Sequence, residues 1–328
     1  MSQVPLEGTP LPAWLTARPG APADLEAVHH LVSAVDAAVL GEPETTLDDL
    51  RAEWSLPRFA VARDVVVVVT DTGRVVGYLS VQEESPGIEL RADIYGHPDV
   101  LADAPIERHL AERAVLRAQH AADQAQSRLA LLAYAVAGEP LEQDLDACGF
   151  DVRRRFWRMV IDLDDVAVEA LPPDLTIEPL DLDRDLVEVH AVLTDAFATH
   201  WGSHGQTLED WRARHLDRAD ADPSLWRVAR RGGEVIGAVV AQEQAGLDFG
   251  WISTVGVREN TRGQGIAGAL LRATFGGLAD RGLRRAMLGV DSQNDTGATR
   301  LYERAGMRVL FVICAWVRDF EPSGERTA

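Results

Sequence analysis

Residues 249–271 read Phe249-Gly-Trp-Ile-Ser-Thr-Val-Gly-Val-Arg-Glu-Asn-Thr-Arg-Gly-Gln-Gly-Ile-Ala-Gly-Ala-Leu-Leu271, and this stretch decides the fold. Its first nine residues form an apolar, β-branched run, which predicts a buried strand that ends at Val257. A glycine-rich turn follows over residues 262–267, and an apolar helix pattern continues from Gly268. Because this order aims several backbone N–H groups at one point, the stretch predicts a phosphate-binding loop.

Two motifs overlap in the turn. Gly263-x-Gly265-x-x-Gly268 matches the dinucleotide fingerprint, with Asp291 available as the acid that binds a ribose. However, five residues separate the strand from Gly263, and a dinucleotide-binding unit needs a longer series of strands and helices after this point than the chain contains. The nicotinamide dinucleotide hypothesis stays open as the alternative.

The second motif, Arg262-x-x-Gly265-x-Ala267, resembles the acetyl-CoA pyrophosphate loop of the GNAT acetyltransferase superfamily. A later segment carries a second resemblance to the same family. Residues 287–291 predict a strand, Asn294 follows it, and Tyr302 lies on the helix predicted next. Two motifs in the family's order imply an acetyltransferase that uses acetyl-CoA as co-substrate.

The chain also contains an internal repeat. Leu25 corresponds to Leu186, Leu47 to Leu208, Gly73 to Gly233 and Cys148 to Ala305, always about 160 residues apart. The resemblance therefore implies an α/β protein with two tandem GNAT-type domains, each a mixed, mostly antiparallel central sheet flanked by helices. We expect an N-terminal domain at 1–162, a linker at 163–175 and a C-terminal domain at 176–328.

The two halves differ at the motif positions. The repeat places Asp103 at Gly263 and Pro105 at Gly265, and residues 97–137 contain no glycine. Proline has no N–H to donate, and an aspartate repels a pyrophosphate. Leu145 corresponds to Tyr302 and has no proton to donate. We expect a degenerate N-terminal domain and a catalytic C-terminal domain.

The resemblance implies roles for individual residues of the second half. Tyr302 is the candidate general acid, which donates a proton to the leaving thiolate. The backbone at Val255 and Val257 would hold the pantetheine arm, and Asn294 would hydrogen-bond to it, unless Asn294 only caps a helix. The residues expected at the pyrophosphate are Arg262, Gly263, Gln264, Gly265, Ile266 and Ala267.

The acceptor side has weaker candidates. Asp248 and Glu243 are the nearest acids that could take a proton from the amine, and Ser253 and Thr254 could orient a water molecule. His200 and Trp201 lie in the region that shapes the acceptor pocket in such folds, although Trp201 could instead pack within the protein. His200 and His204 have no third ligand, so we expect no metal.

Composition limits the function further. The formal net charge is −20 and every basic residue is an arginine, so P-loop and Schiff-base lysines are excluded. Acidic charge disfavours nucleic acid and attracts a cationic amine, or it only keeps the protein soluble. No apolar run is long enough to span a membrane, and no secretory signal is visible. Cys148 and Cys314 predict buried thiols, and a cytoplasmic monomer or homodimer is expected.

These observations predict an N-acetyltransferase that acetylates the primary amine of a small, cationic molecule by direct attack. Three alternatives stay open. The tandem layout also resembles the mycothiol synthase family, which acetylates a cysteinyl amine of a small thiol; a protein N-terminus is a second possible acceptor. The alternative of another class is a non-catalytic acyl-CoA-binding sensor or scaffold.

Overall fold

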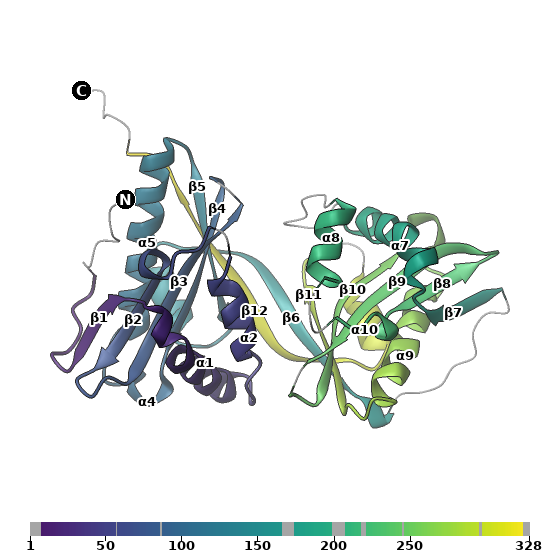
Figure 1. Cartoon of the computed structure of the whole chain (residues 1–328), viewed down its shortest axis with the longest axis horizontal. Coiled ribbons are helices and arrows are strands. Elements are labelled where there is room, and N and C mark those ends of the chain that lie inside the picture. Colours follow the sequence, from purple (N-terminus) through teal and green to yellow (C-terminus); the bar gives the residue numbers. More distant parts are fainter. Residues whose placement is uncertain are drawn as a thin grey trace. The chain divides into compact units, whose positions relative to one another are not determined.

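The chain folds into two units, Met1–Arg155 with Val312–Ala328, and Phe156–Phe311 (Figure 1). The computed structural model describes residues 8–56, 58–85, 87–165, 174–198, 207–217, 221–244, 246–294 and 297–323. Each unit has one mixed, mostly antiparallel sheet with helices on both faces, as predicted. Among the described residues, no helix is long and apolar enough to cross a membrane.

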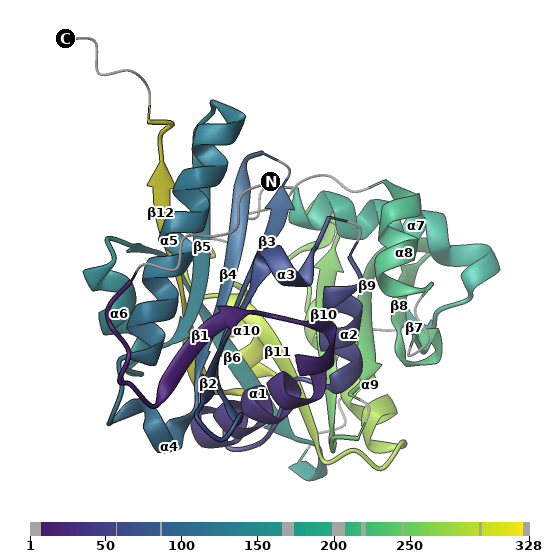
Figure 2. The ribbon, with the colours of Figure 1, turned by 60° about the vertical axis from the view of Figure 1, so that its left-hand side comes forward.

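The first unit follows the predicted order of strands and helices. Its sheet has the strand order β1-β2-β3-β4-β5-β12, in which only β4 and β5 run parallel. Four fully buried alanines on α5, Ala111, Ala114, Ala118 and Ala122, let this helix pack closely on the sheet, and α6 lies beside it (Figure 2). The elements are β1 (Leu15–Pro19), α1 (Leu25–Val39), α2 (Leu47–Trp54), α3 (Val61–Asp64), β2 (Val65–Thr70), β3 (Val75–Ser85), β4 (Glu89–Gly96), α4 (Pro98–Leu101), α5 (Ile106–Ala125), β5 (Leu129–Val136) and α6 (Leu141–Ala147).

The second unit repeats this topology. Its sheet has the order β6-β11-β10-β9-β8-β7, in which only β10 and β11 run parallel. Trp211 and Trp226 are buried in the core of this unit. The elements are β6 (Asp151–Asp162), β7 (Leu175–Pro179), α7 (Leu182–Phe197), α8 (Leu208–His215), β8 (Arg227–Arg231), β9 (Glu234–Glu243), β10 (Phe249–Val257), α9 (Ile266–Ala279), β11 (Arg285–Asp291), α10 (Ala298–Arg304) and β12 (Arg308–Phe320).

The repeat is visible in local chemistry as well as in topology. Thr46 caps α2 by accepting a hydrogen bond from the Asp49 N–H, and Thr207 caps α8 in the same way with Asp210. A threonine cap satisfies a backbone donor that the first helical turn leaves free. In both units, a threonine three residues before an aspartate therefore caps the start of the equivalent helix.

The limits of the units differ from the predicted domains 1–162 and 176–328. Residues 156–162 of β6 pair with β11 of the second unit, and residues 313–320 of β12 pair with β5 of the first. Met159, Val160 and Ile161 are buried in the second unit, while Cys314 and Phe320 are buried in the first. Each half of the chain thus supplies the last strand of the other half's sheet, because that strand buries its apolar face there.

Candidate active site

The pairing between β10 and β11 ends partway along the strands. Parallel pairs run from Phe249–Arg285 to Ile252–Leu288, and a register shift against β9 falls between Ile252 and Thr254. The bulged strand bends at such a shift. In this described part of the sheet, Val255 and Val257 have no strand partner on the β11 side. Strands β10 and β11 therefore splay apart, which leaves backbone groups of β10 available to a ligand.

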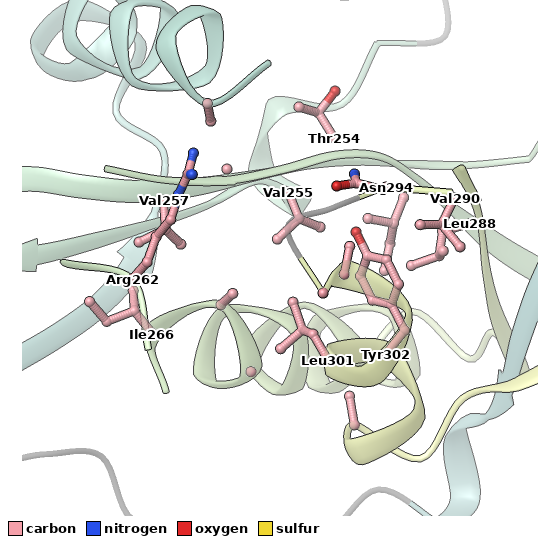
Figure 3. A pocket seen from close by; sticks show the side chains of 18 of the residues that line it. Thr254, Val255, Val257, Arg262, Ile266, Leu288, Val290, Asn294, Leu301 and Tyr302 are labelled. Carbon is pink, nitrogen blue, oxygen red and sulfur yellow. The ribbon is translucent and has the colours of Figure 1, made fainter. Parts of the chain in front are cut away.

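A cavity of about 740 Å³ opens at this splay and lies entirely within the second unit. Its walls are the separated ends of β10 and β11, the glycine turn, the first turn of α9, the end of α7 and one face of α10 (Figure 3). This volume suits a ligand of cofactor size. Gly256 allows α7 to approach, because a Cβ there would lie 2.7 Å from Leu193 Cδ2.

The glycine turn presents free N–H groups to the cavity. Gly263 and Gly265 have φ angles of +76° and +79°, a region that L-residues rarely adopt. Helix α9 begins at Ile266, two residues earlier than the predicted helix pattern, and its N-cap is Gly265, which has no side chain to cap the helix. The first turn also contains no acidic residue. Its unsatisfied donors and the positive end of the helix dipole therefore form an anion site.

The side chains of two predicted pyrophosphate residues make other contacts: Ile266 lines the cavity but is buried, and Gln264 does not line it. The Gln264 side chain turns away, and its Oε1 accepts a hydrogen bond of 2.6 Å from Arg231 Nη1 on β8. The Ile266 side chain is buried in the core beneath α9. Arg262, Ala267 and Asn294 line the cavity as predicted.

The cavity is locally basic in a strongly acidic chain. Its lining includes Arg262, Arg272 and Arg304, against a single carboxylate, Asp291, among the described residues. Arg272 and Arg304 were not among the residues predicted from the sequence. Helical spacing could have predicted Arg272, because residue 272 lies one turn after Gly268 on α9. A basic wall beside free N–H groups is suited to a polyanionic ligand.

Tyr302 projects from α10 into the cavity, with its hydroxyl directed toward the splayed strand β10 (Figure 3). The side chain is largely buried, and this burial raises the pKa of Tyr302 to about 12. Burial disfavours the charged phenolate, so the hydroxyl keeps its proton at physiological pH. The group can therefore donate a proton inside the cavity.

A pH dependence follows from this pKa. Tyr302 stays protonated until the pH approaches about 12, so proton donation is retained below this value and lost above it. We expect kcat, measured with saturating acceptor, to show no decrease caused by Tyr302 up to about pH 10.5. A pH–rate profile between pH 7 and 10.5 checks this. An alkaline decrease with an apparent pKa below 10 that is absent in Tyr302→Phe would contradict it.

The acceptor-side predictions have mixed outcomes. Ser253 lines the cavity, and its hydroxyl donates to the Val240 carbonyl at 3.3 Å. Asp248 does not line it: this residue precedes β10, and its carboxylate accepts from Arg284 Nε at 2.6 Å and also pairs with Arg285. These arginines lower the pKa of Asp248, so its carboxylate is held in a surface ion pair. His200 and Trp201 lie outside the described residues.

The corresponding region of the first unit has a different chemistry. Strand β4 also separates from β5, after the pair Ala92–Ala133, but α5 begins after Pro105. Glu107 in its first turn is buried and accepts a hydrogen bond from the Gly96 N–H, and burial raises its pKa to about 7. An internal carboxyl group thus lies where the second unit has Ala267. Leu145, at the position of Tyr302, is fully buried.

Three features of the second unit are typical of an acyltransferase of the GNAT type: the splayed strands, the helix whose N-cap is a glycine, and the buried tyrosine. A model of the acetyltransferase (GNAT) family matches residues 186–307. A mycothiol acetyltransferase of Streptomyces griseus is 30% identical over 239 residues, which cover 73% of this chain and 75% of that protein.

Solved structures with a similar fold cover most of the chain. A GCN5-related N-acetyltransferase from Sphaerobacter thermophilus is 28% identical with a TM-score of 0.77, covering 94% of this chain and 97% of that one. A tandem GNAT protein from the clavulanic acid biosynthesis pathway shares the fold at 14% identity, with a TM-score of 0.68 and coverage of 93% and 98%. The chain belongs to the GNAT acetyltransferase family, and it is an N-acetyltransferase with a tandem fold that uses acyl-CoA.

Proposed function

We propose that the second unit transfers an acetyl group from acetyl-CoA to the primary amine of a small, cationic molecule. The observation that carries this proposal is the cavity that joins the β10–β11 splay, the first turn of α9 and the Tyr302 hydroxyl. The pyrophosphate binds the N–H groups from Gly263 to Ala267, with Arg262 and Arg272 beside it. The pantetheine arm then lies along the free edge of β10 at Val255 and Val257, near Asn294.

Chemistry proceeds by direct attack of the amine on the thioester carbon. A phenol with a pKa of about 12 is a weaker acid than a thiol of ordinary pKa near 8.5. Transfer from Tyr302 to the thiolate is therefore uphill by about 5 kcal/mol if it leaves a free phenolate. The attacking nitrogen becomes cationic when it bonds to carbon, and its proton restores the phenol. Tyr302 thus relays a proton from nitrogen to sulfur.

One cofactor per chain is expected. The first unit has Pro105 in place of the cap glycine and the Glu107 carboxyl group in the first turn of α5. Neither group offers a pyrophosphate an N–H donor, and a carboxylate repels it. A calorimetric titration should give a stoichiometry of one acetyl-CoA per chain. A second site of similar affinity would contradict the assignment of binding to the second unit alone.

The acceptor class has a second candidate. Because a relative is named as a mycothiol acetyltransferase, the cysteinyl amine of a small thiol is a second candidate acceptor beside other cationic amines. Release of free thiol from acetyl-CoA, measured over polyamine, aminoglycoside, cysteinyl and peptide acceptors, tests the function and the class together. Tight acetyl-CoA binding with no release for any acceptor would favour the sensor or scaffold alternative.

A further inference from the structure

Asp291 is the one carboxylate among the described residues that line the cavity. It ends β11, three residues beyond Leu288, the last residue paired with β10. Its Oδ1 accepts a hydrogen bond of 2.9 Å from the Gln293 N–H, and no ion pair joins it to a described arginine. Every other charged side chain of this wall is an arginine, so Asp291 alone can attract a cation there.

The alternation of side chains along β11 shows which face Asp291 occupies. A Cβ at Gly250 would lie 2.4 Å from Leu278 Cδ2 of α9, and Gly250 is paired with Ala286 in parallel register. Even-numbered residues of β11 therefore face α9, and Leu288 and Val290 lie beside Tyr302 (Figure 3). Asp291 faces the opposite side.

On β10, that opposite face is covered by the helix α7. A Cβ at Gly256, beyond the register shift in β10, would lie 2.7 Å from Leu193 Cδ2 and 3.1 Å from Ala196 Cβ. The odd-numbered Met287 confirms the alternation, because it packs in a separate apolar cluster with Val160 and Phe249. The tyrosine hydroxyl and the carboxylate thus enter one cavity from opposite faces of the splayed strands.

We propose that Asp291 binds the ammonium group of the acceptor and takes its first proton, which makes this residue the determinant of specificity for cationic amines. The inference rests on the proposed function. In the aminolysis of a thioester, an acceptor ammonium must first lose a proton to a base, and the leaving sulfur must gain a proton from an acid. The two faces provide them: Asp291 for the incoming amine and Tyr302 for the departing thiolate.

The protons balance along this route. The ammonium transfers one proton to the Asp291 carboxylate, which later passes it to solvent, and the neutral amine forms the C–N bond. The C–S bond breaks as sulfur takes the Tyr302 proton, and the second amine proton restores the phenol. The net products are the acetamide, coenzyme A with a free thiol, and one proton.

Asp291→Asn is the test, because asparagine keeps an oxygen for the Gln293 N–H and removes only the charge. Thiol release from acetyl-CoA is measured with spermidine, an aminoglycoside and S-methylcysteine methyl ester, and acetyl-CoA binding is measured by calorimetry. With the acceptor that the wild type uses, we expect the acceptor KM to rise because the ammonium contact is lost, and kcat to fall because the proton acceptor is lost. Together these changes should lower kcat/KM at least about 30-fold, with acetyl-CoA affinity unchanged. Asp291→Glu should recover to within about fivefold of the wild type.

Asp248→Asn is the matched control, since Asp248 is held by Arg284 and Arg285 outside the cavity. Its acceptor KM should stay within about twofold of the wild-type value. An unchanged acceptor KM in Asp291→Asn would overturn the inference about Asp291. The proposed function would still stand in that case, provided that the wild type acetylates the acceptor. An equal loss in Asp291→Glu with weakened acetyl-CoA binding would show a structural role and overturn it too. A wild type that binds acetyl-CoA but acetylates none of these amines overturns both, before any variant is compared.

Discussion

Replacing Tyr302 by phenylalanine should reduce kcat by about 10²- to 10⁴-fold, the usual contribution of a positioned proton donor. Phenylalanine keeps the ring that α10 buries in the core and removes only the hydroxyl directed into the cavity. No hydrogen bond to this hydroxyl is found among the described residues, so the fold loses little when it is removed. Steady-state release of free thiol, with saturating acetyl-CoA and acceptor, measures the loss.

Binding provides the control for this variant. The pyrophosphate contacts come from the first turn of α9, not from α10, so the Kd for acetyl-CoA should change by less than about twofold. Thermal unfolding without ligand should shift by no more than a few degrees. A variant with normal turnover would refute the role of Tyr302. Lost turnover with equally lost binding would instead show that the hydroxyl supports the cavity.

The result also separates the enzyme from the sensor. A protein that only binds acyl-CoA has no use for a proton donor beside the thioester. Burial raises the pKa of Tyr302 to about 12, so the group is kept neutral in the one position where a thiolate would leave. A selective loss of kcat is therefore the signature of catalysis.

Much of the fold follows from local patterns in the sequence. The strand predicted up to Val257 is β10. The repeat also predicts that equivalent helices of the two units begin about 160 residues apart. Helices α5 and α9 begin at Ile106 and Ile266, and α6 and α10 at Leu141 and Ala298. Periodicity, glycine turns and a threonine cap are properties of a few neighbouring residues, so a single sequence can show them.

The strand exchange could not be predicted in this way. The apolar run from Phe156 to Asp162 predicts a strand, but the choice of its partner depends on which sheet edge buries it best. Both units offer such an edge, beside β5 and beside β11. Pairing of this kind joins residues far apart in sequence, and no local pattern distinguishes the two edges.

The site was predicted where backbone conformation creates it and missed where side chains converge. Gly263 and Gly265 are needed for positive φ angles, so the loop was visible in the sequence. Asp248 looked close to the thioester because it precedes β10, yet Arg284 and Arg285 hold it at the far end of the strand. Asp291 lines the cavity only because β11 lies beside β10 in parallel register. Spatial neighbours of this type require the sheet register.

Replacing Gly265 by aspartate should weaken acetyl-CoA binding by at least about 100-fold, which is about 2.8 kcal/mol at 1.4 kcal/mol per tenfold change. Two effects act at this residue. Its φ of +79° is costly for a residue with a Cβ, which disturbs the turn that aims the N–H groups. The new carboxylate also lies at the start of α9, the proposed pyrophosphate site, where it would repel the phosphates. Calorimetric titration of acetyl-CoA gives the Kd.

Gly282→Asp is the matched control for backbone strain. Gly282 has a φ of +81°, lies in the exposed turn between α9 and β11, and does not line the cavity. Both variants should lower the unfolding temperature of the free protein by a similar few degrees, because each places an aspartate in the left-handed region. Only Gly265→Asp should lose the cofactor. If the two variants bind acetyl-CoA equally well, the first turn of α9 is not the pyrophosphate site, and the basic wall formed by Arg262, Arg272 and Arg304 must bind the phosphates without it.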